Sequence, residues 1–138
     1  MSIELLKFEN AIEEFRKLNP DFQTQAIMTF LWIARGHEQA MGFSEYDNDS
    51  KEYYDTFTTV GEIAAKMRLS DASASRNVAN LSTRKNRYGN DGHGLVNIVP
   101  NPFNSRSAYI ELTPKGEDLA NKLEYIIGGK IELVDYKD

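Results

Sequence analysis

The amino-acid sequence predicts a mainly helical domain that carries one small β-hairpin. Apolar residues recur at helical spacing through most of the first 35 residues, and two short helical segments with capping residues follow after residue 58. Two strand-like runs, 95–99 and 107–112, enclose a turn rich in Pro and Asn. The chain has 138 residues, 41% of them hydrophobic, which fits one domain with its own core.

The first segment, residues 2–18, is predicted to form an amphipathic helix. Ser2 is a suitable N-cap, and polar residues fill the face opposite the apolar stripe. We expect this helix to serve both the core and a dimer surface, because it is terminal and one face is strongly apolar. The stripe consists of Leu5, Phe8, Ile12 and Phe15.

A second helix is predicted over 20–35, with Asn19 as its cap and Pro20 in its first turn. Its residues are apolar nearly all round, which indicates a central, buried helix. Gly36 is a candidate for a left-handed residue that ends it. The acidic, Tyr-rich residues 37–57 that follow are interpreted as a loop or a short surface helix.

The next two helices are predicted to form a helix-turn-helix. Thr59 and Glu62 have the spacing of a capping box, and a short helix follows them. Residues 68–70 form a tight turn, and Ser70 caps a further helix that runs to Leu81. The inward face of that helix consists of Ala74, Val78 and Leu81.

The opposite face of this helix, within residues 70–83, has the chemistry of a DNA-recognition helix. A helix fits the major groove, where Arg suits guanine and Asn suits adenine. Asp71 at the helix start is the nearby acidic exception. The predicted DNA-binding residues of the helix are Ser70, Ser73, Ser75, Arg76, Asn77 and Asn80.

The region after this helix adds cations and a hairpin. Arg84, Lys85 and Arg87 are candidate phosphate contacts, with a solvated loop as the alternative reading. The hairpin, 94–112, forms a wing, and its tip carries Asn104 and Arg106 for the DNA backbone or minor groove. Thr113 and Pro114 open a last helix that stops at Gly128.

The charge distribution favours this middle part of the chain as a nucleic-acid footprint. The formal net charge is −5, but residues 61–115 carry eight Lys or Arg and four Asp or Glu. Residues 1–60 carry five Lys or Arg and eleven Asp or Glu. A local basic region matters more for DNA than the global balance.

Other function classes find little support in the sequence. The chain has no Cys and two His, so neither a metal site nor Cys catalysis is expected. It shows no phosphate-loop glycine motif, no nucleophile with a nearby base, and no apolar run of membrane length. We therefore expect no catalytic residues, no cofactor and no membrane partner, and a cytoplasmic, nucleoid-associated protein rather than an enzyme.

Two segments resemble the MarR-type winged helix-turn-helix regulators. TVGEIAAKMRLSDASASRNVANL resembles their helix-turn-helix, and GLVNIVPNPFNSRSAYIELTPKGEDLANKL resembles their wing and following helix, so the resemblance covers about residues 20–127. It implies a homodimeric DNA-binding regulator, often a repressor, that responds to a small-molecule effector. The wing arginine of the family corresponds to Arg106. The region after Gly128 is short, with 10 residues.

The predicted architecture is therefore a winged helix-turn-helix flanked by terminal dimerisation helices, in one domain. Residues 1–36 supply core and dimer helices, 58–112 the helix-turn-helix and wing, and 113–128 the C-terminal helix. The predicted function is a sequence-specific regulator that reads a pseudo-palindrome in double-stranded DNA. The alternative is a protein-interaction module on the same scaffold that binds a transcription or other DNA-bound partner.

Overall fold

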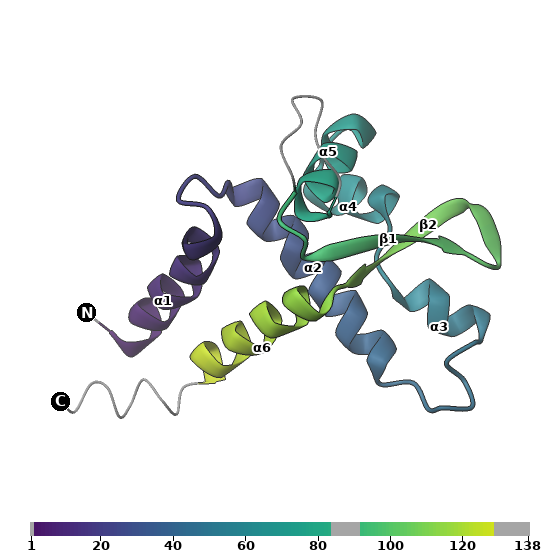
Figure 1. Ribbon diagram of the computed structural model, residues 1–138, viewed down its shortest axis with the longest axis horizontal. Coiled ribbons are helices and arrows are strands. Elements are labelled where there is room, and N and C mark those ends of the chain that lie inside the picture. The colour runs from purple at the N-terminus through teal and green to yellow at the C-terminus, as the bar shows by residue number, and fades with distance from the viewer. Residues whose placement is uncertain (1, 84–91, 129–138) are drawn as a thin grey trace.

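The computed structural model describes residues 2–83 and 92–128 and shows the predicted mainly helical fold with one antiparallel hairpin (Figure 1). The elements in chain order are α1 (Ile3–Leu18), α2 (Thr24–Met41), α3 (Lys51–Thr56), α4 (Val60–Met67), α5 (Asp71–Leu81), β1 (Val96–Asn101), β2 (Asn104–Leu112) and α6 (Pro114–Gly128).

Helix α2 runs through the middle of the molecule and organises the core (Figure 1). Its Phe30 and Ile33 are fully buried, and it packs against α5, β2, α3 and α6. Helix α1 packs on α6 at one end, while the hairpin projects away at the other. The central position predicted for this helix is confirmed, but its burial is one-sided, because Met28 and Leu31 are 43% and 42% exposed.

The predicted caps Ser2, Thr59 and Thr113 form as expected, because capping depends on local chemistry. The Ser2 side chain accepts from the backbone N–H of Leu5 at 3.2 Å, and Thr59 accepts from Glu62 at 3.2 Å. The Thr113 hydroxyl accepts from the backbone N–H of Gly116 at 3.0 Å and so begins α6. Each cap gives a helical N–H the partner that it otherwise lacks.

The predicted bounds of α2 are wrong at both ends. The helix begins at Thr24, because Asn19 turns back locally: its side chain accepts from the backbone N–H of Asp21 at 2.8 Å. Gly36 lies inside the helix and is buried. A Cβ at this position would lie 2.6 Å from Thr58 Oγ1, so the glycine serves close packing on the 57–59 segment.

The acidic, Tyr-rich residues 37–57 contain three kinds of structure. Helix α2 continues to Met41, a turn-rich link follows, and the short helix α3 is capped by Ser50, which accepts from the backbone N–H of Tyr53 at 3.1 Å. Of the two interpretations offered for this stretch, the short surface helix applies to 51–56. No helix within residues 2–83 and 92–128 is long and apolar enough to cross a membrane.

The hairpin strands are longer than predicted, and the turn is shorter. Asn101 pairs with Asn104 across a turn made by Pro102 and Phe103. The ladder is irregular between Val99 and Asn101, which lets Pro100, a residue without a backbone N–H, lie within β1. The predicted turn over 100–105 is therefore wrong in extent.

Candidate nucleic-acid interface

Helix α5 is anchored by its inward face and presents its outward face to solvent. Ala74, Val78 and Leu81 are fully buried against α2 and α4. With 3.6 residues per turn, Arg76 falls nearly opposite these three positions. Of the predicted DNA-binding residues on α5 and at its cap, Ser70, Ser75, Arg76 and Asn80 are exposed, and Ser73 and Asn77 are half-buried.

The first turn of α5 holds the Arg76 guanidinium. Ser70 caps the helix by accepting from the backbone N–H of Ser73 at 3.1 Å, and its hydroxyl donates to Ser73 Oγ at 3.0 Å. Arg76 Nη2 donates to the same Ser73 Oγ at 3.1 Å. A guanidinium has five N–H donors, so this support leaves most of them free for another acceptor.

Asn77 lies at the edge of the outward face and contacts α2. Its Nδ2 donates to Gln25 Oε1 at 3.3 Å, which joins α5 to the first turn of α2. These residues are far apart in sequence, so periodicity along α5 gives no sign of the contact. The structure thus places Ser70, Ser73 and Arg76 in one connected group and holds Asn77 apart from them.

The turn between α4 and α5 contains a residue that sequence reasoning did not select. Arg68 has φ 56° and ψ 46°, and it is the one residue other than glycine with positive φ within 2–83 and 92–128. Its backbone N–H donates to the Ala64 carbonyl and closes α4. This left-handed conformation costs a non-glycine residue about 1–2 kcal/mol. The signal in the sequence was an arginine in a tight turn where glycine or asparagine is favoured.

The wing is fixed at its base on two sides. The backbone N–H of Ile110 donates to the Thr58 carbonyl at 3.0 Å, just before α4. On the other side Val96 forms a parallel bridge with Ser82, directly after α5. The hairpin is therefore attached to both ends of the helix-turn-helix, so its direction relative to α5 is set by backbone hydrogen bonds.

At the wing tip, asparagine side chains shape the backbone. Asn101 is buried and its Oδ1 accepts from the Phe103 N–H at 2.9 Å, while Asn104 Oδ1 accepts from the Arg106 N–H at 3.1 Å. The Arg106 side chain is exposed and has no partner among the described residues. Asn104 thus positions the backbone of Arg106, whose guanidinium is available.

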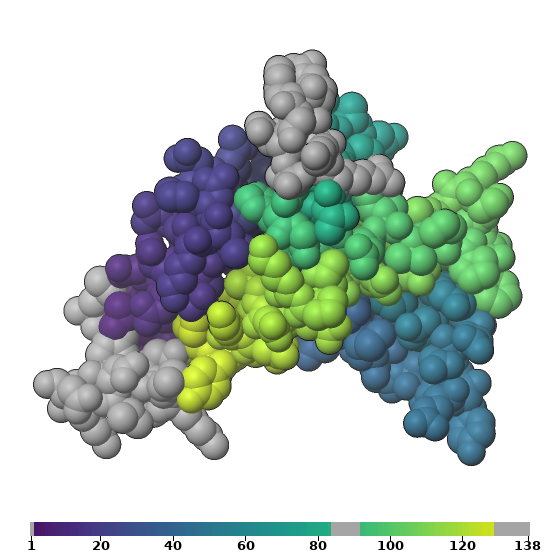
Figure 2. Space-filling view, in the orientation of Figure 1, coloured from purple at the N-terminus to yellow at the C-terminus, as the bar shows by residue number. Residues whose placement is uncertain are grey.

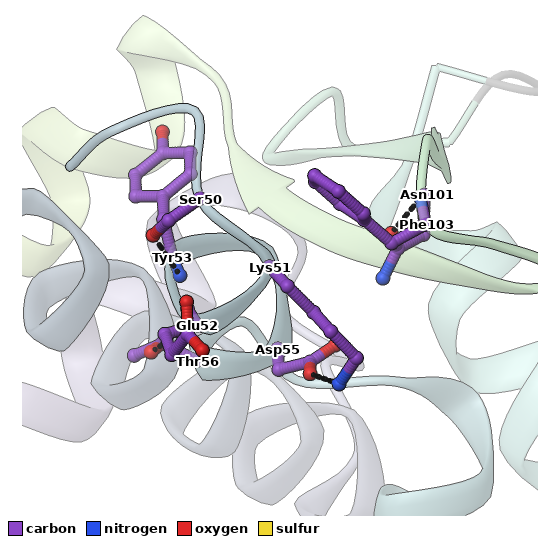
Figure 3. A network of polar contacts seen from close by, with 8 residues as sticks. All are labelled: Ser50, Lys51, Glu52, Tyr53, Asp55, Thr56, Asn101 and Phe103. Carbon is purple, nitrogen blue, oxygen red and sulfur yellow. Dashed lines mark hydrogen bonds and ion pairs between the residues drawn. The ribbon is translucent and has the colours of Figure 1, made fainter.

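Helix α3 supports the wing through aromatic rings. The Tyr109 ring of β2 lies 4.6 Å from Phe57 and 5.5 Å from Tyr54, centroid to centroid. Burial, with Glu111 nearby, raises the pKa of Tyr109 to about 12, so this tyrosine stays neutral. Figure 3 shows α3 beside the wing tip, with Lys51 paired to Asp55. The hydrogen bond from Lys51 lowers the pKa of the Asp55 carboxyl.

Three predicted phosphate contacts, Arg84, Lys85 and Arg87, lie outside the described residues. The described cations near the helix-turn-helix differ in what they contact. Lys66 lies 5.9 Å from the Trp32 ring centroid, and Lys115 donates to the His93 carbonyl at 2.9 Å. Arg68 and Arg106 have no side-chain partner within the described ranges. We call the α4–α5 turn, the outward face of α5 and the wing tip the recognition surface.

A pocket of about 370 Å³ lies away from this surface, between α2 and α6. Its wall includes the buried His37, whose Nδ1 accepts from the backbone N–H of Leu112 at 3.1 Å. Among the described residues, His37 Nε2 has no hydrogen-bond partner, and it lies 3.8 Å from Glu117 Oε1. Burial lowers the pKa of His37, partly opposed by Glu117 and Glu111. No group of three His, Asp or Glu suited to a metal occurs in the described part of the chain.

The end of the molecule formed by α1 and α6 exposes several large apolar side chains among its polar ones. Leu5 and Phe8 of α1 are 61% and 67% exposed, and Tyr125 and Ile127 of α6 are 58% and 60% exposed. In Figure 2 this α1–α6 end lies opposite the wing and α3. Of the apolar stripe that was expected to serve both the core and a dimer surface, Phe15 is buried, whereas Leu5 and Phe8 are exposed in the single chain.

Comparison with known proteins supports the fold. No protein-family model and no curated protein matches the chain. Among solved structures, a mutant form of S. aureus MepR has a TM-score of 0.54 and 15% identity, covering 97% of this chain and 80% of that one. The transcriptional regulator Tm0710 from Thermotoga maritima has a TM-score of 0.45 and 18% identity, covering 80% and 74%. The chain therefore has the winged helix-turn-helix fold predicted from its resemblance to MarR-type regulators.

Proposed function

We propose that the protein is a sequence-specific regulator of transcription that binds double-stranded DNA. The observation that carries the proposal is the outward face of α5, where Arg76 is supported by Ser73 and flanked by the exposed Ser75 and Asn80. Reading of the major groove requires a helix that is fixed to the domain and presents side chains such as arginine to the base edges. Helix α5 has both features.

Within this proposal the predicted site residues take different roles. Arg76 reads a base, with Asn80 and Ser75 beside it, and Ser70 and Ser73 hold the helix start and the guanidinium. Asn77 acts from the edge, because its amide nitrogen already binds Gln25. Arg106, positioned by Asn104, contacts the backbone or minor groove. Arg84, Lys85 and Arg87 remain proposed phosphate contacts.

We further propose that the functional unit is a homodimer that reads a pseudo-palindrome. The exposed apolar residues of the α1–α6 end support this, because such residues are common where one copy packs on another. Two recognition helices related by a two-fold axis then meet half-sites about one helical turn apart. In this proposal the dimer is cytoplasmic and associates with the nucleoid. It represses transcription by binding over a promoter.

The effector implied by the MarR-type resemblance has a candidate place in the α2–α6 pocket. Its size falls within the usual range for small-molecule sites, about 300–1,000 Å³. His37 joins this pocket to the end of β2 through the Leu112 N–H. A ligand bound there would therefore contact the helix that supports α5 and the strand that carries the wing.

The test is selection of duplexes from a random pool by the purified protein, followed by titration of the enriched duplex across salt concentration. We expect a two-fold-related motif and a steep fall of affinity with salt, because phosphate contacts release counterions. An unenriched pool with weak binding at low salt would contradict the proposal. That result would favour the protein-interaction alternative and direct attention to the acidic residues 43–57.

A further inference from the structure

Arg68 lies in a backbone conformation that its side chain does not favour. Its φ of 56° belongs to the left-handed region, which glycine adopts without a steric cost and asparagine tolerates. The turn itself needs only the backbone: the Arg68 N–H and the Leu69 N–H both donate to the Ala64 carbonyl. A glycine at this position would close the same turn with less strain.

The Arg68 side chain makes no stabilising polar or ring contact with the described part of the chain. It is exposed, and within residues 2–83 and 92–128 its guanidinium has no hydrogen bond, ion pair or ring partner. The neighbouring Lys66 differs, since it lies over the Trp32 ring, and Arg76 is held by Ser73. A strained position with an unpartnered cation indicates a role in contact with another molecule.

The place of Arg68 in the chain identifies that molecule. It lies two residues before Ser70, the cap of α5, so it accompanies the helix end that enters the major groove in helix-turn-helix complexes. The groove at that point is bordered by phosphates, and a guanidinium binds phosphate oxygens in a bidentate manner. The nearby carboxylate of Asp71 is exposed and forms no ion pair with Arg68.

We propose that Arg68 is a phosphate-binding residue on duplex DNA, kept in the α4–α5 turn at the expense of fold stability. The inference rests on the proposed DNA-binding function and adds a residue to it. It separates two properties that usually change together in a mutant: loss of the arginine should weaken DNA binding while the fold becomes more stable.

The experiment compares Arg68→Gly, Arg68→Asn and Arg68→Lys with the wild-type chain on the selected duplex and on a scrambled duplex. We expect Arg68→Gly to raise the thermal midpoint and to raise Kd about tenfold on both duplexes, with the slope of log K against log salt smaller by about one. Arg68→Asn should bind like the glycine variant. Arg68→Lys should bind within about threefold of wild type. Lys122→Ala, an exposed cation on α6, serves as the control and should change neither property.

Three results would overturn the inference. Arg68→Gly binding as tightly as wild type would show that the cation does not contact DNA. A loss of affinity accompanied by a lower thermal midpoint would indicate a structural role instead. A loss confined to the selected duplex would indicate base reading. If wild type itself binds no duplex, the proposed function fails, and that outcome differs from failure of Arg68 alone.

Discussion

The recognition surface and the α1–α6 end contrast in the chemistry that they leave exposed. The recognition surface exposes small polar side chains and arginines, with Arg68 and Arg106 unpartnered among the described residues. The α1–α6 end exposes Leu5, Phe8 and Ile127. In the proposed function, these two regions take DNA reading and self-association, and the central helix α2 contacts elements of both.

The largest effect is expected from breaking the α1–α6 end. Phe8→Asp places a charge on an apolar surface that is exposed in one chain, so the monomer should keep its fold within about 0.5 kcal/mol. The dimer should dissociate, and affinity for a two-half-site duplex should fall roughly 10²–10⁴-fold, because two linked contacts become one. Sedimentation and fluorescence anisotropy measure the two changes.

A matched control for this variant is Tyr46→Asp, which changes another exposed aromatic residue, 96% exposed and outside the α1–α6 end. This variant should leave the sedimenting mass of the protein, and therefore its dimeric state, as in wild type. If Phe8→Asp remains a dimer at the concentration where wild type dimerises, the α1–α6 end is not the dimer interface.

The local chemistry of the recognition surface could be predicted from the sequence. Ser70 and Thr59 were identified as caps because a side-chain oxygen three residues before an N–H acts within one turn. The inward and outward faces of α5 followed from a period of 3.6 residues. Arg76 could be assigned to the outward face for the same reason.

Features that depend on contacts between distant segments could not be predicted. Gly36 was expected to end α2 because glycine commonly ends helices, but its neighbour Thr58 is 22 residues away and makes it a packing position. The Asn77–Gln25 hydrogen bond spans 52 residues. The left-handed φ of Arg68 differs from these, because it is a local feature and the tight turn at 68–70 was its signal in the sequence.

The next largest effect concerns base reading by α5. Arg76→Ala should cost about 1–3 kcal/mol of binding free energy on the selected duplex and relax the preference at one base pair. The thermal midpoint and the oligomeric state should not change, because Arg76 is exposed and its side-chain hydrogen bond within the described residues goes to Ser73 of the same helix. Anisotropy with a panel of single-base variants measures it. An unchanged base preference would refute the assignment of Arg76.

A smaller effect is expected on stability as a function of pH. Burial lowers the pKa values of His37 and His93 below the usual 6.5. At a pH of about 7.5 both histidines are neutral in the folded and the unfolded chain. Below about pH 6.5 the unfolded chain takes up protons first, so the free energy of unfolding should fall as the pH falls. Urea denaturation between about pH 7.5 and 5.5 measures this loss.

The variant His37→Gln sharpens this pH prediction. Glutamine can still accept from the Leu112 N–H but cannot titrate, so part of the pH dependence should disappear while His93 keeps the remainder. A profile as steep as that of wild type would mean that His37 does not contribute.

The smallest effect is expected from the hydrogen bond between Asn77 of α5 and Gln25 of α2. Asn77→Ala removes one partly exposed hydrogen bond to α2 and should cost about 0.5–1 kcal/mol of folding free energy. Gln25→Ala should cost a similar amount, and the double variant less than the sum, because both remove the same bond. Additive losses would show that the contact carries no energy.

The most direct test of DNA reading by the recognition surface is amide hydrogen exchange of the protein with and without the selected duplex. We predict slower exchange at the α4–α5 turn, in the first turns of α5 and at the wing tip, with the α1–α6 end unchanged. Protection of residues 43–57 or of the α1–α6 end, with α5 unaffected, would contradict this, because the recognition surface would then not be the part of the molecule that meets DNA.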